Sequence, residues 1–466
     1  MGESSHDPRA DAFDEVLGEA SALAARWLDG VRDGTIPSTA TIDQVKDALG
    51  RELPARGDPA VPVLRRLADA VEPGLIRMDS PRFYGWVIGG TQPVALGADW
   101  LVSSWDQNAA MRAVTPGVVA AEEIAGDWLL RLLGLPRTAE VGFVTGATTA
   151  TTVGLIAGRD EVLRRVGWDA RTEGLAGGPR VRFIAGRERH GSADDAGRYA
   201  GLGAPAVVAS DEQGRIDVTA LRDELAAGSG PAVVSLQAGN VHSGAFDDLA
   251  AATEVAHEAG AWVHVDGAFG LWAAAAPGLA HLTSGMEAAD SWGTDAHKTL
   301  NVPYDSGIAI VADPSVLHAS FAQQAAYLSS AHDSDPSHRV LELSRRARGV
   351  PVWAALARLG SDGVAELVQG LADAATALAA GLREVPGARI LNDVVYTQVC
   401  LAFGDDETTR AVAAAVDASG VAFGSPSTWR GEAVLRFSVS NWLTGPDDVE
   451  RTLEVVREAV GSTARG

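Results

Sequence analysis

The stretch DAHKTLNVP, residues 295–303, contains Lys298, one of only two lysines in a chain of 466 residues. The other is Lys46, and the remaining 36 of the 38 basic side chains are arginines. An arginine guanidinium stays protonated, whereas a desolvated lysine amine can lose its proton and attack a carbonyl to form a Schiff base. The alternative is drift, because one surviving lysine in a lysine-poor chain carries little information by itself. The segments around Lys298 must therefore decide between these interpretations.

An aspartate about thirty residues earlier fits the same chemistry. Asp266, in WVHVDGAFG (262–270), ends a predicted buried strand, at the edge where open α/β sheets bind ligands. A buried carboxylate there requires a positive partner, and a protonated pyridine nitrogen would serve. The alternative is an ordinary turn or helix-capping aspartate.

Two further segments could hold an anionic, aromatic cofactor. In FVTGATTATTVG (143–154), a strand ends before a predicted helix, and amides at a helix N-terminus can bind phosphate. Threonines are also ordinary N-caps, and the turn lacks both nucleotide-loop patterns. His297, next to Lys298, could reach a phosphate, and His190 in GRERHGS (186–192) could stack on a ring. The alternative for His190 is a surface loop histidine.

The elements that must position these residues alternate between apolar strands and helices from residue 140 onward, which predicts a mostly parallel, buried sheet with helices on both faces. The predicted strands are 141–145, 180–186, 205–210, 232–239 and 261–270, and the helices between them include 148–167, 192–203 and 247–260. An amphipathic helix is predicted at 13–28. Beyond residue 345 a long helix (350–382), strands 394–403 and 432–441 and a last helix (447–460) predict a smaller α+β domain. The polar stretch 328–338 is predicted to be a mobile loop.

Composition excludes several classes of function. The net charge of −23 argues against nucleic-acid and anionic-membrane partners. The single Cys400 excludes an intrachain disulfide and a multi-cysteine metal site and is typical of a reducing cytoplasm. No apolar run approaches the roughly 18 residues of a spanning helix, and the polar, acidic N-terminus is unlike a signal peptide.

Taken in order, the strand-end Gly-Ala-Thr, the histidine, Asp-x-Ala and His-Lys resemble the group II pyridoxal-5′-phosphate (PLP)-dependent amino acid decarboxylases, which include the aromatic amino acid and glutamate decarboxylases. The resemblance spans roughly residues 75–445, and TDAHKTLNVPYDSG and HVDGAFG are its specific parts. It implies the fold-type-I α/β architecture, with a mostly parallel seven-stranded sheet and a smaller C-terminal α+β domain. The implied divisions are an N-terminal helical segment (1–75) packing on a partner subunit, a PLP-binding domain (76–345) and a small domain (346–466).

The resemblance also implies residue roles around PLP. Lys298 forms the Schiff base, Asp266 pairs with the pyridinium nitrogen, and Ala268 and His190 lie on opposite faces of the ring. The cofactor site is completed by phosphate-binding or neighbouring residues Gly146, Ala147, Thr148, Asp295 and His297, and by Asn240 near the cofactor hydroxyl.

For the substrate, the resemblance implies a pocket built from Tyr84, Trp86 and Asn108, with Arg436 binding the carboxylate through a bidentate fork. The alternative for Arg436 is a structural ion pair with the large domain. Asn108 stands where the aromatic decarboxylases have an apolar residue, which argues against a purely aromatic substrate.

One departure from the family concerns its mobile loop. Pro336 stands where many members carry the tyrosine that protonates the product carbanion. Proline has no proton to give, so we expect a substitute, with His332 first because histidine titrates near neutral pH. Tyr327, His338 and water are the other candidates.

The sequence therefore predicts a homodimeric, cytoplasmic PLP-dependent L-amino acid decarboxylase, with its active site at the dimer interface and with neither metal, nucleic acid nor membrane as a partner. Alternatives with the same fold are an oxygen-using aldehyde synthase, an aminotransferase or a carbon–carbon lyase. A catalytically silent scaffold is a further alternative, disfavoured by the joint presence of Lys298, Asp266 and His190. The amino acid substrate is left open.

Overall fold

The computed structural model describes residues 12–322 and 335–463, and its larger sheet confirms the predicted α/β class. Within these residues the sheet has seven strands in the order β2-β8-β7-β6-β5-β3-β4. β8 runs antiparallel to both of its neighbours, and the other pairs are parallel. The strands are β2 (Glu140–Val144), β3 (Arg182–Gly186), β4 (Ala206–Val208), β5 (Ala232–Gln237), β6 (Trp262–Asp266), β7 (Ser291–Asp295) and β8 (Gly307–Val311).

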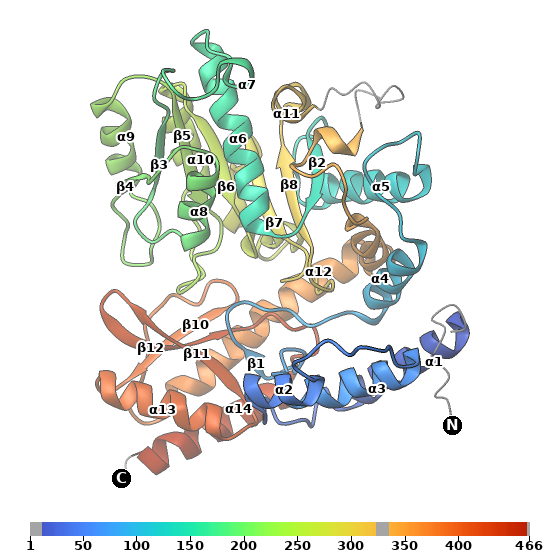
Figure 1. Ribbon diagram of the computed structural model, residues 1–466. Coiled ribbons are helices and arrows are strands. Elements are labelled where there is room, and N and C mark those ends of the chain that lie inside the picture. Colours follow the sequence, from blue (N-terminus) through green and yellow to red (C-terminus); the bar gives the residue numbers. More distant parts are fainter. Residues whose placement is uncertain (1–11, 323–334, 464–466) are drawn as a thin grey trace.

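Helices cover both faces of this sheet (Figure 1). One face packs against α6 (Ala147–Arg165), α8 (Gly191–Tyr199) and α11 (Pro314–Phe321). The other packs against α5 (Pro116–Leu132), α9 (Val218–Ala227), α10 (Leu249–Glu258) and the start of α12 (Gly349–Arg383). The central strands β5 and β6 are almost entirely buried because both faces are covered, which explains their largely apolar sequences.

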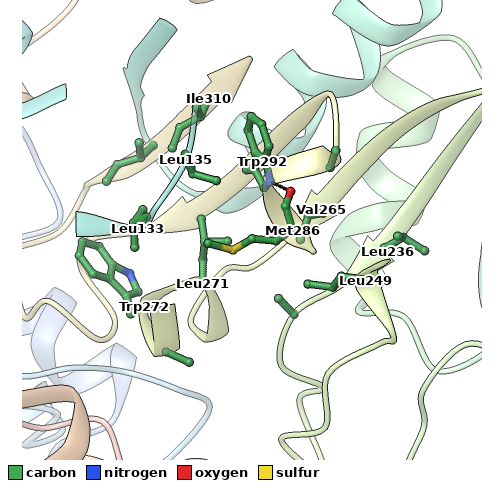
Figure 2. Packing of buried hydrophobic residues seen from close by; sticks show 14 of the residues in the cluster. Leu133, Leu135, Leu236, Leu249, Val265, Leu271, Trp272, Met286, Trp292 and Ile310 are labelled. Atoms are coloured by element: carbon green, nitrogen blue, oxygen red, sulfur yellow. Dashed lines mark hydrogen bonds between the residues drawn. The ribbon is translucent and has the colours of Figure 1, made fainter. Parts of the chain in front are cut away.

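The core on the second face is built around tryptophans. Figure 2 shows Trp292 of β7 and Trp272 among leucines from neighbouring elements, and the Trp292 indole nitrogen donates to the Met286 carbonyl at 2.9 Å. Both indoles are fully buried. This packing fixes β7 beside β6 and therefore the side chains at their ends.

The carboxyl ends of the parallel strands meet at one edge of the sheet. β5, β6 and β7 end in Gln237, Asp266 and Asp295, and β2 leads directly into Gly146 and α6. β8 was not predicted; because it is antiparallel, it starts at this same edge, just after Tyr304. The edge therefore gathers side chains from five strands and their connections.

The smaller sheet has the order β1-β11-β12-β10-β9. Its first strand comes from far upstream, because β1 pairs in parallel with β11 and places Phe83 opposite Phe423. The domain limits stay a prediction, although β1 lies inside the range expected for the large domain. The strands are β1 (Phe83–Tyr84), β9 (Ala388–Ile390), β10 (Gln398–Phe403), β11 (Phe423–Trp429) and β12 (Glu432–Ser438).

The remaining helices frame the two sheets. α12 links the domains and is interrupted at Gly360, whose φ of 63° lies in the left-handed region that favours glycine. The others are α1 (Phe13–Asp29), α2 (Ile42–Leu49), α3 (Ala60–Val71), α4 (Pro93–Trp105), α7 (Ala170–Glu173), α13 (Asp406–Ala418) and α14 (Pro446–Thr463). Short 3-10 helices are η2 (Glu72–Gly74), η3 (Gly270–Ala275), η4 (Ala280–Thr283), η5 (Met286–Ala288) and η6 (Pro336–His338). α1–α3 lie beside the small domain (Figure 1).

Among the described residues, no helix is long and apolar enough to cross a membrane, and no group of acidic, histidine or cysteine side chains is arranged to hold a metal ion.

A buried ion pair joins α5 to the segment that leads into α12. The Arg345 guanidinium donates to both carboxylate oxygens of Glu122, at 3.0 and 2.6 Å, and Glu122 also accepts the Gly349 amide at 3.1 Å. The two side chains are 2% and 3% exposed. Removing one partner of such a pair leaves an uncompensated buried charge.

We expect Glu122→Ala to lower the free energy of unfolding by about 3–5 kcal/mol, because Arg345 would remain buried without its carboxylate. Denaturant unfolding at fixed protein concentration measures this loss. The matched control is Glu258→Ala, which breaks the exposed Arg222–Glu258 pair and should change the same quantity by less than about 1 kcal/mol. Equal losses in the two variants would contradict the assigned role of the buried pair.

Candidate active site

Lys298 lies at the sheet edge with its amine held by Asp295. The Lys298 Nζ atom is 2.8 Å from Asp295 Oδ2, and the other carboxylate oxygen accepts the Ala147 amide at 2.6 Å. Asp295 is the last residue of β7 and is almost completely buried. The carboxylate therefore fixes the lysine amine beside the N-terminus of α6.

Asp266 ends the neighbouring strand β6 and is 6% exposed. Its Oδ1 accepts the Ala268 amide at 3.2 Å, and among the described residues no cationic side chain is in ion-pair contact with it. Burial raises the pKa of Asp266, against the opposing effect of the positive charges that His190 and Lys298 can carry. A cationic ring nitrogen would supply the partner that this carboxylate lacks.

His190 caps α8 with its own side chain. Its Nδ1 accepts the Ser192 amide at 3.2 Å and lies 2.7 Å from the Ser192 hydroxyl. An accepting Nδ1 leaves the proton of the neutral ring on Nε2. Although the ring is open to the cavity, desolvation lowers the pKa of His190, only partly offset by Asp266. The lowered pKa favours the neutral ring at neutral pH.

His297 is held in one tautomer in the same way. Its Nδ1 accepts the Ser306 amide at 3.2 Å, and its Nε2 lies 3.6 Å from Asp295 Oδ2. Burial lowers the pKa of His297. The ring of Tyr304 stacks on it with centroids 4.2 Å apart, and burial and the nearby charge of Asp295 raise the pKa of Tyr304 to about 12.

The turn between β2 and α6 fits a phosphate group. The first intrahelical bond runs from the Ala150 amide to the Gly146 carbonyl at 2.9 Å, so the Thr148 and Thr149 amides precede it and lack intrahelical partners. α6 is 19 residues long, and its dipole favours an anion at this end. The Ala147 amide, expected to help bind the phosphate, instead donates to Asp295. The donor set and the buried Asp266 thus fit the phosphate and the ring nitrogen of PLP.

These residues line one cavity of about 380 Å³. From the predicted set the cavity brings together Trp86, Gly146, Ala147, Thr148, His190, Asp266, Ala268, Asp295, His297 and Lys298. Sequence reasoning missed its other lining residues, Val87, Ile88, Ser192, Gln237, Gly239, Val241, Phe269 and Tyr304. The loop that runs from Lys298 back to the sheet edge was the available signal for Tyr304.

Two predicted residues are placed elsewhere. Tyr84 is not a pocket residue, because it is buried in the small-domain core with its hydroxyl 3.0 Å from that of Thr452. Asn240 does not line the cavity. Its side chain bonds only backbone groups: it donates to the Glu188 carbonyl and accepts the amides of His242 and Ser243.

Arg436 lies directly behind the cavity wall. Its guanidinium donates to the Val241 carbonyl at 2.6 Å and the Trp86 carbonyl at 3.2 Å. Neither expected role is seen, since both terminal nitrogens hold backbone carbonyls and no carboxylate pairs with Arg436 among the described residues. Burial lowers its pKa to about 10. In this structure Arg436 fixes two cavity-lining residues.

The loop residues and Asn108 lie away from the cavity or outside the described residues. Asn108 is exposed, and its side-chain oxygen accepts the Arg345 amide at 3.1 Å. Pro336 and His338 are buried in η6, whose Ser337 amide donates to the Ala110 carbonyl, and neither lines the cavity. His332 and Tyr327 fall in 323–334, outside the described residues.

Replacing Asp266 should raise the stability of the apo protein and weaken PLP binding. A raised carboxyl pKa favours folding only below the unfolded pKa of about 3.9, and this contribution is lost as pH rises through the folded pKa. Apo Asp266→Asn should therefore melt roughly 2 °C or more above apo wild type at pH 7, a gap that closes on acidification. With PLP the order should reverse, with at least about tenfold weaker PLP binding.

The matched control is Asp247→Asn. Asp247 is also a buried carboxylate with a raised pKa, about 6, but it accepts the Ile216 and Gln237 amides at 2.7 Å each. Its replacement should lower the melting temperature of apo and PLP-loaded protein alike. An apo Asp266→Asn protein that melts below wild type at pH 7 would contradict the assignment of an unpaired carboxylate.

Known proteins resemble this chain along almost its whole length. The pyridoxal-dependent decarboxylase conserved domain matches residues 43–403. Aromatic-L-amino-acid decarboxylase of Sus scrofa is 26% identical over 454 residues, covering 93% of each chain. The crystal structure of Oryza sativa TDC with PLP and tryptamine has a TM-score of 0.91 at 23% identity, covering 98% of this chain and 99% of that one. Rhodiola rosea 4-hydroxyphenylacetaldehyde synthase has a TM-score of 0.87 at 20% identity, covering 97% and 99%.

The structural likenesses establish the fold, and the family match bears on the chemistry. The matched range contains every residue that lines the cavity, including Lys298 and Asp266. It covers well over half of the chain. The chain therefore belongs to the pyridoxal-dependent decarboxylase family and is a PLP-dependent lyase.

Proposed function

We propose that this enzyme removes the carboxyl group of an aromatic L-amino acid as carbon dioxide and releases the amine. The observation that carries the proposal is the cavity at the sheet edge, where the Lys298 amine, 2.8 Å from Asp295, faces the same space as the buried Asp266. A lysine is the residue that can hold PLP covalently. A buried carboxylate is the residue that can hold its ring nitrogen protonated.

PLP supplies an electron sink for the pair of electrons released when the Cα–carboxylate bond breaks. Asp266 would stabilise positive charge at the ring nitrogen, and the neutral His190 ring would be available for stacking. Thr148, at the N-terminus of α6, and His297 support phosphate binding. Lys298 would hold the cofactor covalently.

The cavity wall favours a large, flat side chain. Trp86, Ile88, Phe269 and Tyr304 contribute apolar or aromatic surface, and aromatic groups pair favourably with aromatic walls. The polar Asn108 no longer argues against such a substrate, because within this chain its side chain is bound to the Arg345 amide. The name of the Sus scrofa relative supports the same substrate class.

We also propose that the enzyme is a homodimer that works in a reducing compartment such as the cytoplasm. Large apolar side chains of α1–α5 are exposed in the single chain, among them Leu17, Leu67, Trp100 and Trp105. Leu67 and Trp100 line one groove, and exposed apolar surface of this kind marks protein interfaces. Cys400 is buried and unpaired, which suits a compartment without disulfides. Residues supplied by the partner would complete the site, as the family resemblance implies.

The test of the function uses Lys298→Arg with Lys46→Arg as its matched control, since Lys46 is exposed on α2. Arginine keeps the charge beside Asp295 but cannot form a Schiff base. Lys298→Arg should lose the borohydride-fixed PLP label and at least roughly a thousandfold in turnover. Lys46→Arg should match wild type, and peptide mapping should find the label on Lys298.

Products of the wild-type enzyme decide the outcome of the reaction. Equal amounts of amine and carbon dioxide from an aromatic L-amino acid support decarboxylation. An aldehyde with ammonia and peroxide would instead show oxidative chemistry at this site. A keto acid would instead show transamination. Label on Lys46, or none, would contradict the role of Lys298.

The homodimer predicts that a charge on α4 disrupts association. Trp105 is 47% exposed and lines an apolar groove with Val114, Ile124 and Trp353. Trp105→Asp should shift the sedimenting species from dimer to monomer and weaken association by at least about tenfold. The matched control is Tyr199→Asp on α8, where the replaced aromatic is 60% exposed and the dimer should persist. A dimer unaffected by Trp105→Asp would contradict this placement of the interface.

A further inference from the structure

Asn301, three residues after Lys298, makes five hydrogen bonds to backbone groups through its side chain. Its side-chain amide nitrogen donates to the carbonyls of Lys298 at 3.1 Å, Thr299 at 2.8 Å and Ser440 at 3.0 Å. Its side-chain oxygen accepts the amides of Gly90 at 2.7 Å and Trp442 at 3.0 Å. Five backbone groups from three separate segments therefore meet at one carboxamide, which is fully buried.

The backbone of Asn301 is held in an uncommon conformation. Its φ of 56° is left-handed, which asparagine tolerates better than most residues. The Asn301 amide also donates to the Lys298 carbonyl at 3.1 Å, so that carbonyl receives both the main-chain and side-chain N–H groups of Asn301. The peptide from which the Lys298 side chain starts is thereby fixed.

The second segment that bonds the Asn301 side chain, residues 85–92, forms part of the cavity wall. Its Trp86, Val87 and Ile88 line the cavity. The segment is tied to Asn301 through the Gly90 amide and through the Gln92 amide, which donates to the Asn301 carbonyl at 2.9 Å. Gly89 packs so closely that a Cβ there would lie 2.1 Å from the Lys298 carbonyl oxygen. The wall and the lysine peptide therefore touch, with Asn301 bonding both.

The third segment belongs to the small domain. Ser440 and Trp442 follow β12, and they bond the two ends of the Asn301 carboxamide. A single side chain thus links the small domain to the cofactor lysine and to the cavity wall.

We propose that Asn301 is a positioning residue that holds the Lys298 peptide and the wall segment 85–92 in register, so that the lysine amine meets PLP in one orientation. The proposal rests on the assignment of Lys298 as the residue that holds PLP. It concerns PLP binding and cavity shape, and it is independent of which amino acid is the substrate. Asn301 acts through Lys298 and does not itself contact the reacting atoms.

The test compares Asn301→Asp with Asn392→Asp. Both replacements put an acceptor oxygen where an amide nitrogen donates to three carbonyls, because Asn392 donates to Ser243, Asp393 and Gln398 and accepts the Cys400 amide. Asn392 is also buried, but its carboxamide bonds neither the Lys298 peptide nor the wall segment 85–92. The readouts are the Kd for PLP, the visible circular dichroism of bound PLP and the melting temperature of the apo protein.

Asn301→Asp should bind PLP at least about tenfold more weakly, because the loss of a few buried hydrogen bonds corresponds to a factor of that size, and its visible dichroism should diminish. Asn392→Asp should lower the melting temperature comparably while changing the Kd for PLP less than about twofold. Unchanged PLP binding and dichroism in Asn301→Asp, or equal changes in both variants, would overturn the proposal.

Asn301→Gly provides a second route if the aspartate variant does not fold, since glycine accepts a φ of 56° and removes the carboxamide without repulsion. The same loss of PLP affinity and dichroism is expected, and wild-type values would overturn the proposal. None of these readouts requires decarboxylation, so they test the role of Asn301 even if the enzyme catalyses a different PLP reaction. If borohydride labels no Lys298 in wild type, the proposed function and this role fall together.

Discussion

The architecture depends on the burial of two carboxylates at the ends of adjacent parallel strands. Asp266 and Asp295 end β6 and β7 and are both almost completely removed from water. Such burial is tolerated only with compensating positive charge or hydrogen bonds. Asp295 obtains both within the chain, from the Lys298 amine and the Ala147 amide. Asp266 obtains one backbone bond, and a cationic cofactor nitrogen would supply the rest of its compensation. Within the described residues, Asp266 is therefore the less compensated carboxylate of the two.

The parts of this site that depend on local pattern were predictable from the sequence. Buried strands such as AVVSLQ at β5 carry an unmistakable apolar run, and the residues that follow parallel strands must gather at one edge. β7 reads SWGTD and shows neither alternation nor an apolar run, so its burial could be learned only from its neighbours. β1, two residues long, has no sequence signal.

The sequence did not reveal how a side chain is oriented when its bonding partner is distant in sequence. Tyr84, Asn240 and Arg436 have chemically suitable side chains, but their bonds go to Thr452, Glu188 and Val241. No spacing rule identifies partners up to several hundred positions away. Tyr304 was missed for a different reason, because the loop that brings it onto His297 is closed by β8, an antiparallel strand without a predicted counterpart.

The pairing of β1 with β11 constrains how the chain folds during synthesis. Phe83 lies opposite Phe423, so the first strand of the small sheet leaves the ribosome long before its partner exists, an interval on the order of tens of seconds. All strands of the large sheet are complete by Val311, and that sheet can form in the meantime. The early segment must wait as an unpaired edge, a state prone to wrong pairing. The small sheet can therefore be completed only after β11 and β12 have been synthesised, and a ribosome that stalls before residue 423 would leave this edge exposed.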